Sequence, residues 1–320
     1  KEEYSENMNL SYAFEQVVGS KEMEKMFIEQ FSCDFHDFFE LEKRKAKSAS
    51  LSQVFFCKDK ETKESLVLKL QLPGIKEQIH AQLKLLKLIP KAGPVKKWGV
   101  DIEAYKKSIT NLLDLELNFE HEMKWIQIFD SIFSGVAYFQ LPKLYPRFQS
   151  SMMYFQTEVR GEALADLVLN DSLDDSEKRF VLKSLFEFHC ISLIKGNALQ
   201  TDGNLGNFHL EKSSQSIKMG FLDFGAVKAF DENFVLGFLR LYMAVKNKNS
   251  DSPLALLAVL GFERKKLLAI RSKLPMLLNL LLEPFVSTKP VSLNQWHLNQ
   301  RLDSLLGEHK WWFRSAGGQE

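Results

Sequence analysis

Residues 200–225 of this 320-residue chain read QTDGNLGNFHLEKSSQSIKMGFLDFG, and this stretch decides the fold. Its first part is dense in Asp, Gly and Asn, as loops are. An apolar run at 217–222 then reads as a short strand, and Asp223-Phe224-Gly225 follows it directly. Asp202 and Asn207 stand in the spacing Asp-x₄-Asn. Two acids and one amide therefore occur in a fixed order around a predicted hairpin.

The order of Asp-x₄-Asn, strand and Asp-Phe-Gly is the pattern that protein kinases use for phosphoryl transfer. This chemistry needs a carboxylate that orients or deprotonates the acceptor hydroxyl, and oxygen ligands for the Mg²⁺ that bridges the nucleotide phosphates. Asp202 is the candidate catalytic carboxylate, and Asn207 and Asp223 are the candidate metal ligands. Local hydrogen bonding in turns explains each motif alone. The three together, in this order, favour phosphoryl transfer.

A lysine within an apolar strand is the second element of the site. Residues 66–71 read LVLKLQ, so Lys69 lies in a run that should be buried, where an unpaired ammonium is costly. A phosphate or a carboxylate should therefore meet it. The alternative is a lysine on an edge strand whose charged end reaches water. Two acids in the segment DLELNFEHE at 114–122, Glu116 and Glu122, compete to hold Lys69 against the α- and β-phosphates.

Composition excludes several classes of protein. The chain is 45% hydrophobic and 26% charged, so it can bury a core and is not intrinsically disordered. Lys and Arg number 42 against 41 Asp and Glu, which lacks the basic excess of a nucleic-acid-binding protein. The three cysteines are too few for a disulfide framework and indicate a reducing compartment. The longest apolar run, at 274–286, is shorter than the roughly 20 residues that span a bilayer.

The hydrophobic pattern predicts an α+β fold of two lobes. Residues 53–58 and 65–71 read as a hairpin, and most of the chain after residue 162 has helical spacing. Helices are also expected at 8–40, 75–89 and 108–132, and a short strand at 152–159. We expect an N-lobe at residues 1–159, with a helical N-terminal extension, and a helical C-lobe at residues 160–320.

Several stretches resemble the UbiB family of atypical kinase-like proteins, the aarF-domain-containing or ADCK-type group linked to coenzyme Q biosynthesis. The resemblance covers nearly the whole chain. Residues 46–54, AKSASLSQV, are similar to the family's alanine-rich loop AAASIGQV, and residues 67–75, VLKLQLPGI, to its strand AVKVQRPGI. Residues 116–122 resemble its ExD-containing segment, 200–207 its HADPHPGN loop, and 314–318, RSAGG, its RxxGG signature.

This resemblance implies a protein-kinase-like bilobal fold, in which an N-lobe antiparallel sheet with added helices joins a mainly helical C-lobe. It implies ATP and Mg²⁺ as cofactors, with Asp202 and Lys69 as the catalytic residues. The alanine-rich loop stands where other kinases have a glycine-rich phosphate loop, and Glu116 is favoured over Glu122 as the partner of Lys69. The residues expected to bind the nucleotide are Ala49, Ser50, Lys69, Glu116, Glu158 and Val159.

The chain departs from the family pattern at several points. No KxGQ signature is present, and we expect that element, which restrains protein phosphorylation in the family, upstream of Lys1. Asn118 replaces the acid of ExD, Gly203 replaces a proline, and Lys47 and Ser48 interrupt the alanine run. The first change removes one charge beside the nucleotide, and the others alter loop stiffness.

The function predicted from sequence is that of an ATP-binding, Mg²⁺-dependent atypical kinase, acting as an ATPase or phosphotransferase that supports ubiquinone or other isoprenoid lipid metabolism. The alternatives are a pseudokinase scaffold and a small-molecule kinase of the aminoglycoside or choline type. A lipid or quinone precursor is a candidate ligand. Residues 274–282 are a candidate peripheral membrane contact, although the core of the C-lobe is the simpler interpretation. The compartment stays open between cytoplasm and an organelle, mitochondrion or plastid, with membrane association a candidate.

Overall fold

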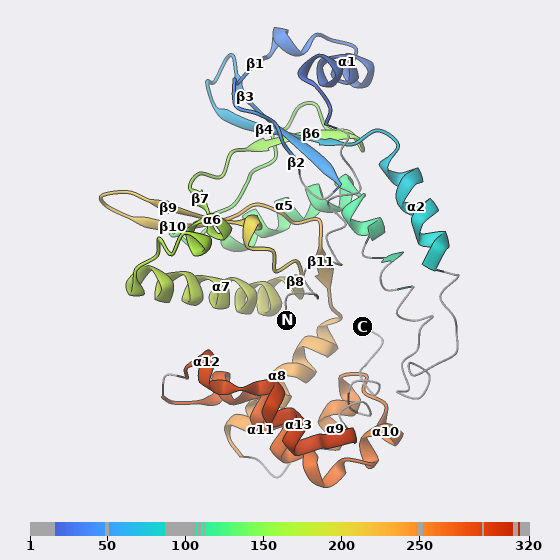
Figure 1. Ribbon diagram of the computed structural model, residues 1–320, viewed down its shortest axis with the longest axis vertical. Helices are drawn as coiled ribbons and strands as arrows, with labels where there is room; N and C mark the ends of the chain where they lie inside the picture. The colour runs from blue at the N-terminus through green and yellow to red at the C-terminus, as the bar shows by residue number, and fades with distance from the viewer. Residues whose placement is uncertain are drawn as a thin grey trace. The chain divides into compact units, whose positions relative to one another are not determined.

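The computed structural model describes residues 17–48, 51–86, 107, 110–111, 113–248, 252–289, 291–309 and 313. The chain forms two compact units (Figure 1). Unit 1 comprises Lys1–Leu85 with Thr110–Lys228, and unit 2 comprises Leu86–Ile109 with Ala229–Glu320. The lobe boundary expected after residue 159 lies inside unit 1 and stays a prediction.

The first sheet of unit 1 is the predicted hairpin with a strand added on each side. Its strands run in the order β1-β3-β4-β6 with antiparallel pairing, and β2 also pairs with β3. Lys69 lies opposite Val54 on one neighbouring strand and opposite Tyr154 on the other, so it occupies an interior strand of the sheet. The strands are β1 (Phe39–Leu41), β2 (Lys47–Ser48), β3 (Ser52–Asp59), β4 (Ser65–Gln71) and β6 (Met153–Thr157).

Aromatic side chains build the core above this sheet. Phe27 meets Phe35 and Phe155 edge to face, and Phe39 stacks on Phe155 with ring centroids 4.4 Å apart. The helical prediction for 8–40 was wrong at 39–41, where aromatic Phe39 fits the half-buried surface of a strand and pairs with β3. The helices beside the sheet are α1 (Ser20–Phe31), η3 (Phe35–Asp37), α2 (Ile75–Leu86) and α5 (Phe119–Phe133).

The second sheet of unit 1 carries the motif stretch. Its order is β5-β10-β9-β7, in which β9 and β10 form the predicted hairpin and β10 pairs with β5 in parallel. A further pair, β8 and β11, flanks the motif loops. Strands of two or three residues are too short to show a sequence period, so the mainly helical prediction missed them. The strands are β5 (Phe139–Gln140), β7 (Glu162–Ala163), β8 (Ala198–Gln200), β9 (Phe208–Lys212), β10 (Ile217–Phe221) and β11 (Val227–Ala229).

The helix α7 (Asp175–Gly196) supports this second sheet. It begins at Asp174, which forms a capping box with Glu177, and the left-handed Asn197 ends it. Its Phe188 stacks on Phe221 of β10 with centroids 3.8 Å apart. The fully buried Phe224 packs on Phe129 of α5 at 5.1 Å, so the residue after Asp223 is anchored in the core. The remaining helical elements of unit 1 are α6 (Leu164–Leu169) and η4 (Leu205–Asn207).

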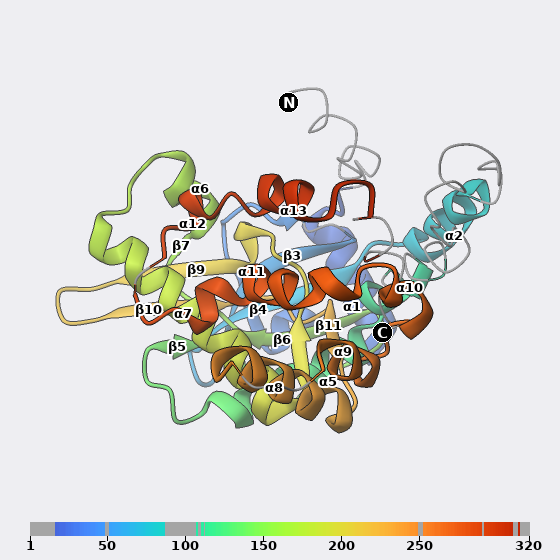
Figure 2. The same cartoon turned by 90° about the horizontal axis from the view of Figure 1, so that it is seen from below.

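Unit 2 is helical in its described residues. Helices α8, α9 and α11 pack together (Figure 2), and Leu274, Leu277 and Leu278 of α11 are buried in their shared core. No described helix has the length and apolar content that crossing a bilayer requires. The elements are α8 (Glu232–Lys246), α9 (Pro253–Val259), α10 (Arg264–Leu268), η5 (Arg271–Lys273), α11 (Leu274–Val286), α12 (Leu293–Trp296), α13 (Leu298–Leu306) and η6 (Gly307–His309).

Gly161→Ala should destabilise unit 1 more than most glycine substitutions. Gly161 has φ +114°, and an added Cβ would lie 2.7 Å from the backbone of Leu210 and Glu211, which cannot move without disturbing β9. We expect a loss of about 2–4 kcal/mol in the free energy of unfolding. Denaturant unfolding measures it, with Gly135→Ala as the control because nothing lies within 4 Å of a Cβ there. Equal stabilities of the two variants would contradict this packing.

Candidate functional site

A buried cation and two carboxylates form the centre of the candidate site. The Nζ of Lys69 forms an ion pair with Glu122 of α5 and lies 3.3 Å from an Oδ of Asp223. The side chains of Lys69 and Glu122 are 7% and 4% exposed, whereas that of Asp223 is 33% exposed. Asp223 is therefore the member of the three that a ligand can reach. The structure brings together residues from β4, from α5 and from the loop after β10.

The charges of this cluster are mutually dependent. Burial alone would lower the pKa of Lys69, but the carboxylates of Asp223 and Glu122 raise that pKa above its ordinary value. Burial raises the pKa of Glu122, opposed by Lys69. The pKa of Asp223 is lowered, because the Lys69 ammonium and the N–H of Gly225 outweigh its burial. Lys69 thus stays cationic and Asp223 anionic at neutral pH.

The preference for Glu116 as the partner of Lys69 was wrong, since the structure puts Glu122 there. The reason is the start of α5. Asn118 caps this helix by accepting a hydrogen bond from the N–H of His121, and Gln71 of β4 donates to the carbonyl of Leu117 at 2.7 Å. Glu116 therefore precedes the helix, whereas Glu122 lies on its first turn beside β4. The expected role of Glu116 in nucleotide binding stays a prediction.

The Asp-x₄-Asn loop is held by its own hydrogen bonds. Asp202 accepts from the N–H of Asn204 at 3.1 Å and from the side-chain amide of Asn207 at 2.5 Å. The N–H and hydroxyl of Thr201 both donate to the carbonyl of Ala226, at 3.0 and 2.7 Å. The N–H of Leu222 donates to the carbonyl of Asn207. These bonds connect the Asp202 loop to both sides of Asp223.

A small cavity of about 30 Å³ joins these groups, and Lys69, Glu116, Glu122, Asp202 and Asp223 all line it. The structure thus assembles these predicted residues, with Asn207 bonded to one of them. They fit Mg²⁺, which prefers oxygen ligands and takes only one or two of them from protein when phosphates supply others. The side-chain nitrogen of Asn207 donates to Asp202. Its amide oxygen makes no hydrogen bond with the described residues and is therefore available to a metal ion. No group of three or more His, Cys, Asp or Glu among the described residues forms an all-protein metal cage.

The remaining predicted nucleotide residues have different positions. Ala49 and Ser50 lie outside the described residues. Glu158 directly follows β6, and its two carboxylate oxygens accept from the guanidinium of Arg44 at 2.6 and 3.0 Å. This guanidinium also lies 4.0 Å from the ring centroid of Phe56. No sequence pattern predicted this contact, because Arg44 lies in a loop without a motif. Roles of Glu158 and Val159 in nucleotide binding stay predictions.

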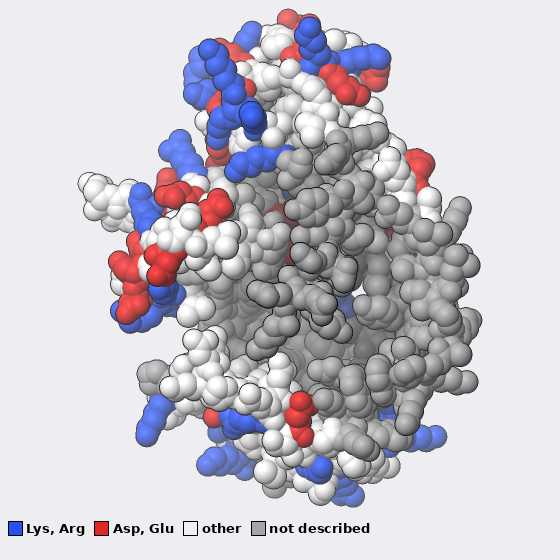
Figure 3. Space-filling model, in the orientation of Figure 1, with Lys and Arg blue, Asp and Glu red and all other residues white. Residues whose placement is uncertain are grey.

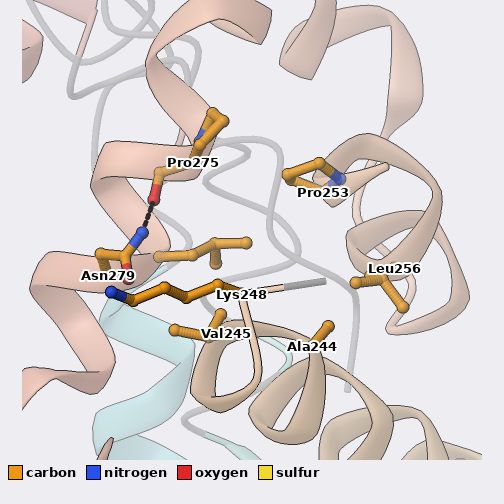
Figure 4. Close-up of a pocket in the computed structure, with 8 residues that line it drawn as sticks. Ala244, Val245, Lys248, Pro253, Leu256, Pro275 and Asn279 are labelled. Atoms are coloured by element: carbon orange, nitrogen blue, oxygen red, sulfur yellow. Dashed lines mark hydrogen bonds between the residues drawn. The ribbon is translucent and has the colours of Figure 1, made fainter. Parts of the chain in front are cut away.

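A second cavity among the described residues carries none of the predicted catalytic, nucleotide-binding or metal-binding residues. A cavity of about 330 Å³ in unit 2 is lined mainly by apolar side chains, with Lys248 and Asn279 as its polar members (Figure 4). On the face in Figure 3, blue Lys and Arg side chains are interspersed with red Asp and Glu, in keeping with the nearly balanced charge. The small cavity around Lys69 and Asp223 is therefore the candidate site.

Comparisons with known proteins found a matching family model and several relatives. The model of the ABC1 atypical kinase-like domain matches residues 15–256. The mitochondrial atypical kinase COQ8 of Saccharomyces cerevisiae is 22% identical over 225 residues, 70% of this chain and 44% of the yeast protein. COQ8B of Danio rerio, also mitochondrial, is 24% identical over 315 residues, 94% of this chain and 48% of the fish protein. The chain thus spans about half the length of these curated relatives.

A solved structure shares the fold. The Mycobacterium tuberculosis protein Rv3197, determined in complex with erythromycin, superposes with a TM-score of 0.62 at 19% identity. The match covers 89% of this chain and 71% of the Rv3197 chain. This likeness, together with the antiparallel sheet of unit 1, confirms the predicted α+β kinase-like class.

Proposed function

Because the chain belongs to the family of ABC1 atypical kinase-like domains, we propose that it binds ATP with Mg²⁺ and acts as an ATPase or a phosphotransferase. The observation that carries this proposal is the buried contact of Lys69 with both Glu122 and Asp223. Burying these charges costs desolvation free energy that apolar side chains would avoid, which supports a functional reason for keeping them. Phosphate binding beside a metal-binding acid is such a use.

Each residue then has a chemical task. Lys69, oriented by Glu122, places its positive charge against the phosphates. Asp202 accepts or orients the proton of the attacking hydroxyl or water, and its bond to Asn207 fixes its direction. Asp223 and the amide oxygen of Asn207 would hold Mg²⁺, which when bound neutralises charge on the phosphates. Thr201, bonded to Ala226, keeps Asp202 and Asp223 on facing loops.

The biological setting is proposed from the relatives. Their names describe mitochondrial atypical kinases and, in Arabidopsis thaliana, a chloroplastic member, so we assign this chain to an organelle. We further propose that the acceptor or effector is a lipid or a quinone precursor and that the activity supports ubiquinone or other isoprenoid lipid metabolism. A response of turnover to phenolic quinone precursors tests this step. Transfer to soluble alcohols or amines instead would favour the small-molecule kinase.

A pseudokinase scaffold is the alternative that Asn118 suggested from sequence. In the structure Asn118 caps α5, a task that an asparagine performs as well as an aspartate. Its presence therefore follows from helix formation and does not by itself favour loss of catalysis. The acids of the proposed chemistry, Asp202 and Asp223, are retained.

Asp202→Asn should separate an enzyme from a scaffold. It removes the proton acceptor but keeps the shape, so turnover should fall by about 10²- to 10³-fold while nucleotide affinity changes by less than about threefold. Phosphate release and equilibrium nucleotide binding are the measurements. Asp231→Asn is the matched control, because Asp231 caps α8 and asparagine caps equally well. Equal phosphate release from wild type and Asp202→Asn would favour the scaffold.

A further inference from the structure

His209 carries a buried polar atom that lacks a partner. Its Nδ1 is buried and makes no hydrogen bond with the described residues. Buried polar side-chain atoms are almost always hydrogen-bonded, because leaving one unpaired is unfavourable. For comparison, the Nδ1 of His189 bonds to the carbonyl of Leu185 at 2.7 Å. The backbone of Val159 interacts with the imidazole, but the described residues form no hydrogen bond of good geometry to Nδ1.

His209 lies on the face of β9 that is turned away from the core. Side chains alternate along a strand, and Phe208 and Leu210 both point into the core that contains Phe188. His209 therefore lies on the opposite face. Asn207, whose amide contacts Asp202, precedes His209 by two residues and ends the short helical element η4.

Residues from several segments of the chain surround the imidazole of His209. Gly220 lies opposite His209 on β10, and a Cβ there would be 3.2 Å from the Cβ of His209 and 2.5 Å from a methyl group of Val159. Glycine at 220 thus lets Val159, directly after Glu158, pack down beside the imidazole. Lys47, at the start of the alanine-rich loop, is near enough for its charge to act on the imidazole. His209 lies among residues from the loop, from the end of β6 and from β9 and β10.

We propose that His209 hydrogen-bonds through Nδ1 to the nucleoside part of the bound nucleotide and so determines which nucleoside triphosphate the chain accepts. This inference rests on the proposed nucleotide binding. The Lys69 cluster and Asp202 line the small cavity, whereas His209 lies outside that lining, beside Val159, which is one of the residues that the sequence predicts to bind the nucleotide. The hydrogen-bonding groups that differ between nucleosides lie on the edge of the base, and one of them would satisfy Nδ1, whereas the ribose hydroxyls are the same in all four nucleotides.

The test compares nucleotide selectivity in His209→Leu, His209→Asn and wild type. Leucine removes the polar atom, whereas the amide of asparagine puts one close to the position of Nδ1. Dissociation constants are measured with Mg²⁺ for ATP, GTP, CTP and UTP. Purine riboside triphosphate, which lacks the exocyclic amino group, and 2′- and 3′-deoxy-ATP then distinguish the base edge from the ribose. His189→Leu is the matched control, because its imidazole is bonded within α7.

We expect His209→Leu to weaken binding of the preferred nucleotide by about 5- to 20-fold and binding of the other nucleotides by less than about twofold. His209→Asn should keep most of the selectivity. Wild type should bind the analogue that lacks the bonded group more weakly by the same factor. Equal loss for all nucleotides, or unchanged selectivity in His209→Leu, would overturn the proposal and point to a packing role or a bound water. Should His209→Leu fail to fold, His209→Gln replaces it with the same outcomes. Failure of wild type to bind any Mg²⁺-nucleotide would contradict the proposed function instead.

Discussion

Lys69→Met is expected to remove catalysis and to destabilise unit 1 at the same time. The substitution leaves the carboxylates of Glu122 and Asp223 side by side without their cation. Breaking a buried ion pair from one side costs about 3–5 kcal/mol. Loss of the charge that contacts the phosphates should lower kcat/KM by at least about 10²- to 10³-fold. Denaturant unfolding and phosphate release measure the two effects.

A second variant separates stability from chemistry. In Lys69→Met/Glu122→Leu both members of the buried pair are apolar and similar in size, and such replacements are often neutral or stabilising. The remaining carboxylate of Asp223 is 33% exposed and can be hydrated. We therefore expect the double variant to recover most of the unfolding free energy while turnover stays lost. Lys183→Met is the control, because the ion pair of Lys183 with Glu187 is solvent-accessible and should contribute little to the free energy of unfolding. Recovery of turnover in the double variant would remove Lys69 from the chemistry.

The single variant should also respond to pH. Burial raises the pKa of Glu122, and without Lys69 the main contribution that opposes this rise is gone. Protonation then removes the unpaired charge, so the destabilisation of Lys69→Met should be largest at high pH and shrink as the pH falls. Unfolding free energies at several pH values between about 5 and 8 test the sign. A destabilisation that grows toward low pH would contradict a buried Glu122 carboxylate.

Asp223→Asn is expected to separate metal-dependent from metal-independent nucleotide binding. The substitution removes the partly exposed carboxylate, and asparagine can still accept the 2.9 Å bond from the N–H of Gly225, so the loop should keep its shape. Loss of groups that only support a metal ligand costs about 10- to 100-fold, so loss of the ligand itself should lower Mg²⁺-ATP affinity by more than about 100-fold. Without Mg²⁺, ATP should bind as well or slightly better, because one negative charge is gone.

Calorimetric titration of ATP, with Mg²⁺ and then with a chelator, is the measurement. Asp171→Asn is the control, since Asp171 is 88% exposed and pairs only with Lys178 at the surface. Unchanged Mg²⁺-ATP affinity in Asp223→Asn would remove Asp223 from the metal site. An equal loss with and without Mg²⁺ would assign Asp223 to the nucleotide or to the fold instead.

The family was identifiable from motifs alone, and the match of the ABC1 model to residues 15–256 confirms it. The motifs could be recognised because each consists of neighbouring residues whose local structure follows from their chemistry. Asp202 and Asn207 lie in one turn-rich loop, and the strand β10 was visible as an apolar run at 217–222 directly before Asp223. The strand that holds Lys69 was visible for the same reason.

The sequence by itself therefore determined which groups the site contains: a lysine on an apolar strand, an Asp-x₄-Asn loop and an acid after a short strand. Only the tertiary structure decided which groups meet. Glu122 reaches Lys69 because Asn118 starts α5 where it does, and Arg44 meets Glu158 across 114 positions of the chain. The strand β5, only Phe139–Gln140, exists because β10 lies beside it. Local structure follows from the chemistry of adjacent residues. Contacts between distant residues depend on packing and on the requirement that buried charges be paired.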